Sequence, residues 1–111
     1  MTVMLDCNIL RSAALFPGGK SALFVEALIS AYPVLICSFS MEELARVVAR
    51  KFPGKGGVIE TYIASSGITV FPTPDDIRMD GMPEMRDPED YPILRSAMDA
   101  GVDVLLSGDN D

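Results

Sequence analysis

Histidine is absent from the 111-residue sequence, and basic residues are few. Without histidine the chain cannot build the Ser-His or Cys-His pairs that activate many enzyme nucleophiles. It also cannot build the usual zinc sites, because the two cysteines alone do not close one. Any catalytic chemistry must therefore come from carboxylates, hydroxyl groups, lysine or a bound metal ion.

Cysteine and long apolar runs are also scarce. Cys7 and Cys37 are too few for a disulfide framework, and we interpret both as reduced thiols in the core. No stretch approaches the roughly 18 apolar residues that cross a bilayer, and the start lacks a basic-then-apolar signal segment. These features predict a cytoplasmic chain with no membrane contact. Its length suits one domain over residues 1–111, and its 49% hydrophobic content suffices for a core.

Acidic residues outnumber basic ones by 16 to 9, which gives a net charge of −7. Such a charge argues against binding nucleic acid, which favours basic surfaces. The objection weakens if several acids form a metal site. Two divalent ions would add four positive charges and bring −7 to −3. Acidity gathered in one site is different from an acidic surface.

Continuously apolar runs alternate with amphipathic segments along the chain. We expect strands at 2–6, 33–37, 68–71 and 102–106 and helices at 9–15, 20–31, 40–52, 58–66 and 90–100. Strands that are apolar throughout favour a parallel sheet covered on both faces. Residues 72–90 contain many prolines, glycines and acids, and we expect a long surface loop there. The predicted fold class is therefore α/β.

Local patterns predict how the helices begin and which faces they bury. Asn8 is expected to cap the first helix, and Ser40-Met-Glu-Glu43 has the pattern of a capping box. The helix at 20–31 is expected to bury Leu23, Phe24, Ala27, Leu28 and Ala31. The helix at 58–66 is expected to bury Val58, Ile59, Tyr62 and Ile63, with Gly67 as its left-handed cap. The last helix is expected to bury Ile93, Leu94, Ala97 and Met98.

Carboxylates gather where parallel sheets form their sites, at the carboxyl ends of the strands. Asp6 ends the first strand, and Asp109 and Asp111 follow the last one. Glu43 and Asp90 stand in the first turns of helices. Clustered carboxylates repel one another, and a cation makes the cluster favourable. The sequence therefore predicts a metal site at this edge of the sheet.

Each of these acids also has a purely local interpretation. Asp6 and Asp90 could only cap helices, Glu43 could only complete the capping box, and Asp109 could be a turn residue. Arg46 and Arg50 share one helix stripe with Glu42. The simpler interpretation of that stripe is a solvated, salt-bridged face, and the alternative is a small patch that contacts phosphate.

The ordered motifs resemble the PIN domain, and most closely its bacterial branch of toxins related to VapC. They are Leu5-Asp6-Cys7-Asn8, Met41-Glu42-Glu43-Leu44, Arg86-Asp87-Pro88-Glu89-Asp90 and Ser107-Gly108-Asp109-Asn110-Asp111. The resemblance implies a three-layer α/β/α fold with a central parallel sheet. It also implies Mg²⁺- or Mn²⁺-dependent endonuclease activity on RNA, an antitoxin protein as partner, and a homodimer.

The resemblance also assigns roles to individual residues. Asp6, Glu43, Asp90 and Asp109 match the four family acids and are the predicted catalytic residues. The predicted metal ligands are Asp6, Asp90, Asp109 and Asp111. Asn8 and Ser107 match polar residues that orient the acids. Apart from the resemblance, the helix stripe described above makes Arg46 and Arg50 the predicted RNA contacts. Cys7 and Ser107 replace the threonines usual in the family, and the family's last strand is expected to be missing.

Two other function classes stay open beside a metal-dependent endoribonuclease of a toxin–antitoxin pair. A receiver-type binding module also places acids at strand ends, but it needs a lysine after its last strands. No lysine follows Lys55. The second alternative is a catalytically inactive PIN-like domain that acts as a protein-binding module.

Overall fold

The computed structural model describes residues 1–76, 82, 84 and 90–107. Within them, four parallel strands form one sheet in the order β3-β2-β1-β4. The strands are β1 (Val3–Leu5), β2 (Val34–Cys37), β3 (Thr69–Phe71) and β4 (Val104–Leu106). Strand β1 is buried throughout and lies between β2 and β4. The segments that follow all three of these strands therefore meet at one edge of the sheet.

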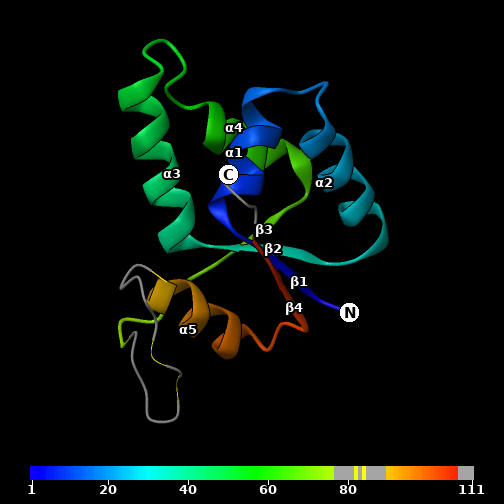
Figure 1. Ribbon diagram of the computed structural model, residues 1–111, viewed down its shortest axis with the longest axis vertical. Helices are drawn as coiled ribbons and strands as arrows, with labels where there is room; N and C mark the ends of the chain where they lie inside the picture. Colours follow the sequence, from blue (N-terminus) through cyan, green and yellow to red (C-terminus); the bar gives the residue numbers. More distant parts are fainter. Residues whose placement is uncertain (77–81, 83, 85–89, 108–111) are drawn as a thin grey trace.

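Helices cover both faces of this sheet (Figure 1). On one face lie α1 (Cys7–Leu15), α2 (Lys20–Ala31), α3 (Ser38–Lys51) and α4 (Val58–Ser66), and on the other lies α5 (Asp90–Ala100). Val3 and Leu5 join the core under α1 to α4, whereas Met4 packs with Ala97 of α5. This alternation along β1 explains why the whole strand is apolar. The predicted three-layer α/β/α fold is confirmed.

Helices α1 and α3 begin earlier than the sequence predicted. Helix α1 starts at Cys7, and its N-cap is Asp6, whose carboxylate accepts the Cys7 N–H at 2.6 Å. Asn8 already lies inside the helix, so its predicted capping role was wrong. Helix α3 starts directly after β2 at Ser38, and Ser40 is buried within its first turn. The predicted capping box was therefore also wrong.

Thr73, in the segment after β3, supplies the cap that Ser40 does not. Its Oγ1 accepts the Phe39 N–H at 3.0 Å, and its own N–H donates to Ser38 Oγ at 2.9 Å. Ser96 Oγ of α5 lies 3.0 Å from the same Thr73 oxygen. Thr73 thus ties the first turn of α3 to α5, two helices that carry predicted acids.

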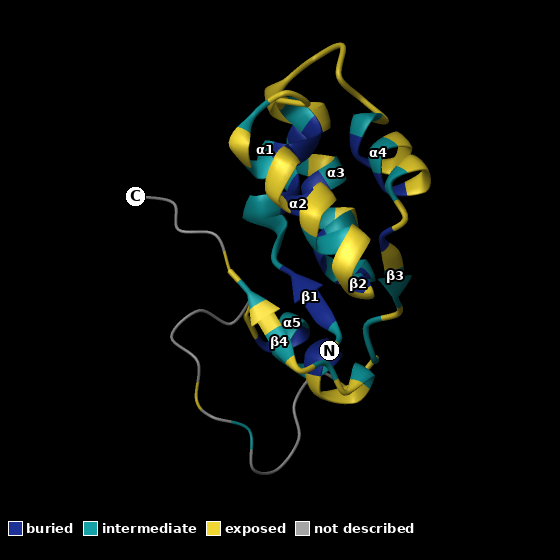
Figure 2. Ribbon diagram, turned by 90° about the vertical axis from the view of Figure 1, so that its right-hand side faces the viewer, coloured by how far each residue is buried: buried dark blue, intermediate teal, exposed yellow. Residues whose placement is uncertain are grey.

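Helix α2 buries a different face from the one predicted. Ala22 and Val25 are buried, while Leu23 is 59% and Phe24 46% exposed. The predicted core residues Ala27 and Ala31 are also exposed, as Figure 2 illustrates for the outer face of this helix. The small side chains of Ala13 and Ala14 on α1 and Ala22 on α2 are all buried. Close packing of these alanines sets the rotation of α2 and leaves its largest apolar side chains outside.

The buried faces predicted for α4 and α5 agree better with the structure. Ile59 and Ile63 of α4 are buried, Val58 and Tyr62 pack against the same core, and Gly67 ends the helix with φ 93°. On α5, Ala97 is buried as predicted, but Met98 is 45% exposed because Tyr91 and Ser96 take the inward positions. None of the described helices combines the length and the apolar character that spanning a bilayer requires.

Candidate active site

Asp6 stands at the carboxyl end of the central strand and is held from three directions. Its backbone N–H donates to the Leu106 carbonyl at 2.9 Å, which continues the pairing of β1 with β4. One carboxylate oxygen accepts the Cys7 N–H at 2.6 Å, and the other accepts the Ser107 hydroxyl at 3.0 Å. A carboxylate has about four lone-pair positions, so each oxygen can take a further partner.

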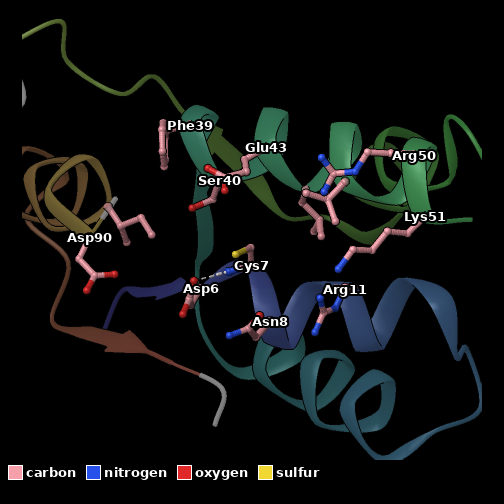
Figure 3. Close-up of a pocket in the computed structure, with 13 residues that line it drawn as sticks. Asp6, Cys7, Asn8, Arg11, Phe39, Ser40, Glu43, Arg50, Lys51 and Asp90 are labelled. Carbon is pink, nitrogen blue, oxygen red and sulfur yellow. Dashed lines mark hydrogen bonds between the residues drawn. The ribbon is translucent and has the colours of Figure 1, made fainter. Parts of the chain in front are cut away.

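A cavity of about 340 Å³ opens beside Asp6, between α1, α3 and the start of α5 (Figure 3). Its acidic end carries Asp6, which caps α1, Glu43 of α3 and Asp90 of α5. Its other end carries Arg11, Arg50 and Lys51. A smaller cavity of about 190 Å³ also borders Asp6 and Asp90 and is lined by Ser107. The site therefore has two ends of opposite charge.

The fold positions most of the predicted site residues around this cavity. Asp6, Glu43, Asp90 and Asn8 line it, and Ser107 contacts it through Asp6. Asp109 and Asp111 lie outside the described residues. Arg50 lines the basic end, whereas Arg46 is exposed on α3 and does not line the cavity.

The Cys7 thiol reports the electrostatics of the acidic end. Burial, and after it the negative charge of Asp6, raises the pKa of Cys7 to about 12, and Glu43 adds to the rise. The thiol is therefore protonated at neutral pH and contributes no charge to the site. Within the described chain, Cys7 and Cys37 are both free, and Cys37 is buried with its thiol 3.3 Å from Ser40 Oγ.

The donor chemistry of the acidic end fits a hard divalent cation. The described acids there offer only carboxylate oxygens, the ligands that Mg²⁺ and Mn²⁺ prefer. Over the described residues alone, however, no three acidic, cysteine or histidine side chains stand close enough together to hold a metal ion. The three acids share a cavity without forming a finished coordination shell, so the choice of ligands remains a prediction.

Sequence reasoning missed Arg11 as a site residue and gave Lys51 no specific role. The helical spacing contained the information, because residues three or four apart lie on one helix face. Arg11 stands three residues after Asn8 on α1. On α3, Glu43, Val47 and Lys51 follow one another at intervals of four, and all three line the cavity.

Comparison with known proteins supports the relationship suggested by the motifs. The fold matches that of VapC20 from Mycobacterium tuberculosis, a sarcin-ricin loop cleaving toxin, with a TM-score of 0.66 and 14% identity over 98% of this chain and 91% of that one. It also matches VapBC2 from Rickettsia felis bound to a promoter DNA fragment, with a TM-score of 0.71 and 16% identity over 98% of this chain and 100% of that one. No curated protein matches the sequence at a significant level.

The family comparison covers nearly the entire sequence. The PIN domain family model matches residues 2–111, a range that includes the strand-end acids and the helices that carry Glu43 and Asp90. Together with the parallel sheet and the position of the cavity at its carboxyl edge, this match shows the relationship directly. The chain belongs to the PIN domain family.

Proposed function

We propose that this protein is a metal-dependent endoribonuclease and the toxin of a toxin–antitoxin pair. The observation that carries the proposal is the setting of Asp6, which is fixed through both carboxylate oxygens and shares one cavity with Glu43 and Asp90. Membership of the PIN domain family and the VapC fold support the same conclusion.

In this proposal Asp6, Asp90, Asp109 and Asp111 hold Mg²⁺ or Mn²⁺, with Glu43 beside them. When bound, such an ion acidifies a water molecule and offsets negative charge on the phosphodiester. The chain's own residues prepare the site. The Cys7 N–H and the Ser107 hydroxyl fix the direction of the Asp6 carboxylate, since both donate hydrogen bonds to it. Asn8, which lines the cavity from the first turn of α1, is the proposed residue that orients the acids.

The proposal extends to partners and location. The substrate is RNA, which an acidic chain can approach when a cation lies between carboxylates and phosphate. An antitoxin protein and a second copy of the chain are the proposed protein partners, and the apolar side chains Leu23 and Phe24, exposed on α2, favour protein contacts. The cytoplasm is the proposed location, because the proposed RNA substrate and antitoxin occur there.

The fold and the exposed apolar residues also fit a second candidate function. The described acids do not by themselves form a metal-binding group of three. A PIN-like domain without activity, acting only as a protein-binding module, would have the same fold and the same exposed apolar residues. This candidate differs from the first in one measurable property, because it does not bind the metal ion.

The test compares the wild-type protein with two matched variants on structured RNAs, in Mg²⁺, in Mn²⁺ and in chelator. Asp6→Asn should fold, since asparagine is also a good N-cap, and should lose cleavage by about a hundredfold or more. Asp99→Asn removes an exposed acid at the far end of α5 and serves as the control. If Asp6→Asn cleaves RNA in the presence of metal as fast as the wild type, the assignment of Asp6 to the active site is wrong.

Thermal unfolding with Mn²⁺ separates the two candidates. A binding-competent site gains about 2.7 kcal/mol of stability when the ion is present at about 100 times its Kd. That gain should be present in the wild type and in Asp99→Asn, and reduced in Asp6→Asn. No gain in the wild type, together with no cleavage, identifies the inactive protein-binding module.

A further inference from the structure

The basic end of the cavity is unusual for so acidic a chain. Only nine residues are lysine or arginine, and three of them, Arg11, Arg50 and Lys51, line this one cavity. They come from two helices, and Figure 3 shows the Lys51 side chain on α3 extending toward Arg11 on α1. Their convergence is a property of the packing of α1 against α3.

Three like charges that face one cavity repel one another unless an anion lies between them. Within the described part of the chain, no carboxylate forms an ion pair with Arg11, Arg50 or Lys51. Arg11 is half-buried on α1, so its charge is less screened by water than that of a surface arginine. A bound anion would therefore stabilise this arrangement.

The chemistry of the three side chains favours phosphate as that anion. The planar guanidinium groups of Arg11 and Arg50 match two oxygens of a phosphate, and the Lys51 ammonium adds a point charge. The opposite end of the same cavity carries Asp6, Glu43 and Asp90. An RNA strand carries a phosphate at every nucleotide, so it can present one at each end. An acidic peptide would bring further carboxylates toward the three acids.

We propose that Arg11, Arg50 and Lys51 form a subsite for a phosphate that neighbours the one to be cleaved. This inference rests on the proposed function, because it takes the acidic end as the place of cleavage. Contact with a non-reacting phosphate holds the RNA strand in register with the acids. Such contacts act equally on bound substrate and transition state, so their loss raises KM and leaves kcat unchanged.

The sequence predicted Arg46 as an RNA contact beside Arg50, but the proposed subsite does not include Arg46, so this residue provides a matched control. It lies on α3 like Arg50, carries the same side chain, and is exposed without lining the cavity. The experiment measures binding of a fluorescein-labelled single-stranded RNA by fluorescence anisotropy, in chelator so that no cleavage occurs. The proteins are the wild type, Arg11→Gln, Arg50→Gln, Lys51→Gln and Arg46→Gln.

Each cavity variant should bind the RNA about tenfold more weakly at low salt. Its slope of log K against log salt should also fall by about 0.7, the value of one phosphate contact on a single strand. Arg46→Gln should match the wild type. Arg11→Lys should recover part of the affinity, because it keeps the charge and loses the planar fork. Because Arg11 is half-buried, thermal unfolding is used to check that its variants fold. If Arg11→Gln does not fold, the variants of the exposed residues Arg50 and Lys51 test the subsite.

The outcomes separate the subsite from the proposed function. Cleavage rates are measured for the same proteins in Mn²⁺. If the folded variants Arg11→Gln, Arg50→Gln and Lys51→Gln cleave RNA with the KM of the wild type, the subsite is overturned and the nuclease is retained. Weaker RNA binding in these variants, with no cleavage by the wild type, shows that the basic end binds an RNA phosphate but rejects the nuclease and with it the neighbouring cleaved phosphate. If Arg46→Gln loses as much RNA affinity as the cavity variants, RNA is attracted by positive charges spread over the surface rather than by the cavity, and the subsite is overturned. The subsite would also be overturned if the variants lose binding of a polyglutamate peptide but keep their affinity for RNA, because the basic end of the cavity would then bind an acidic protein segment.

Discussion

The Ser107 hydroxyl donates a hydrogen bond to Oδ2 of Asp6 at 3.0 Å, although 101 positions separate the two residues. Strand pairing places them there, because Leu5 lies opposite Leu106 in the parallel register of β1 and β4. The residues that follow these two positions must therefore be neighbours. The resemblance to the PIN domain assigned Ser107 to orienting the acids, and the hydrogen bond gives that prediction a definite atom to act on.

Removal of the Ser107 hydroxyl should weaken the site without unfolding the chain. We expect Ser107→Ala to lower Mn²⁺ affinity or cleavage by about 10- to 100-fold, as is typical when a residue that orients a metal ligand is lost. Ser107→Thr keeps a hydroxyl group and is the matched control. Titration of Mn²⁺ by thermal shift, with cleavage rates alongside, measures both effects. Equal metal affinity in Ser107→Ala and Ser107→Thr would show that the hydrogen bond does not position Asp6.

Thr73 should matter for stability more than its place in a connecting segment suggests. Thr73→Val removes the acceptor for the Phe39 N–H and the partner of Ser96 Oγ. We expect a loss of about 1–3 kcal/mol in the free energy of unfolding, the usual cost of leaving such groups unpaired. Thr73→Ser keeps the oxygen and should lose much less. Urea unfolding gives both values, and similar stabilities for the two variants would contradict the capping role.

The raised pKa of Cys7 predicts a falling stability at alkaline pH. In the unfolded chain the thiol ionises near its ordinary pKa of 9.0, whereas in the folded chain its pKa is about 12. Between these values the folded state binds more protons than the unfolded state, so stability decreases as pH rises from 9 toward 12. Cys7→Ser should flatten this part of the pH profile. In Cys37→Ala at pH 9, iodoacetamide should label Cys7 slowly in the folded protein and rapidly in urea, and equal rates would contradict the shift.

The rotation of α2 predicts opposite effects for neighbouring residues. Phe24→Ser changes an exposed side chain and should alter the free energy of unfolding by no more than about 0.5 kcal/mol. Val25→Ala removes atoms from a fully buried position and should cost about 2 kcal/mol or more. Urea unfolding of both variants measures the contrast. A larger loss of stability in Phe24→Ser than in Val25→Ala would indicate that α2 buries the face that the sequence pattern predicted.

The sequence allowed the sheet to be predicted because the central strands β1 and β2 are apolar along their whole length. Burial on both faces forces this composition on β1, where Leu5 and Met4 enter different cores. The acids Asp6, Glu43 and Asp90 could be placed for a related reason. A parallel sheet brings the ends of its strands to one edge, so residues far apart in sequence can be assigned to one site.

Other features depended on tertiary packing that no local pattern contains. Ser40 has the right sequence neighbours for an N-cap, but β2 passes straight into α3 and Thr73 takes over the capping. The apolar pattern of α2 offers two faces, and the buried alanines of α1 select the one with smaller side chains. Arg11 has an ordinary helical setting, and its role is visible only once α1 lies against α3 with Lys51 opposite.

The pairing of β4 with β1 has a consequence for the order of events during protein synthesis. Asp6 follows β1, which is synthesised before the other three strands of this sheet, but its Ser107 partner is added 101 residues later. Contacts of such large sequence separation form late in folding because the intervening chain must first be ordered. A nascent chain therefore carries Asp6 without its orienting hydroxyl until β4 docks on the sheet. If the proposed ribonuclease activity depends on that hydrogen bond, a chain in which β4 has not yet docked lacks full activity.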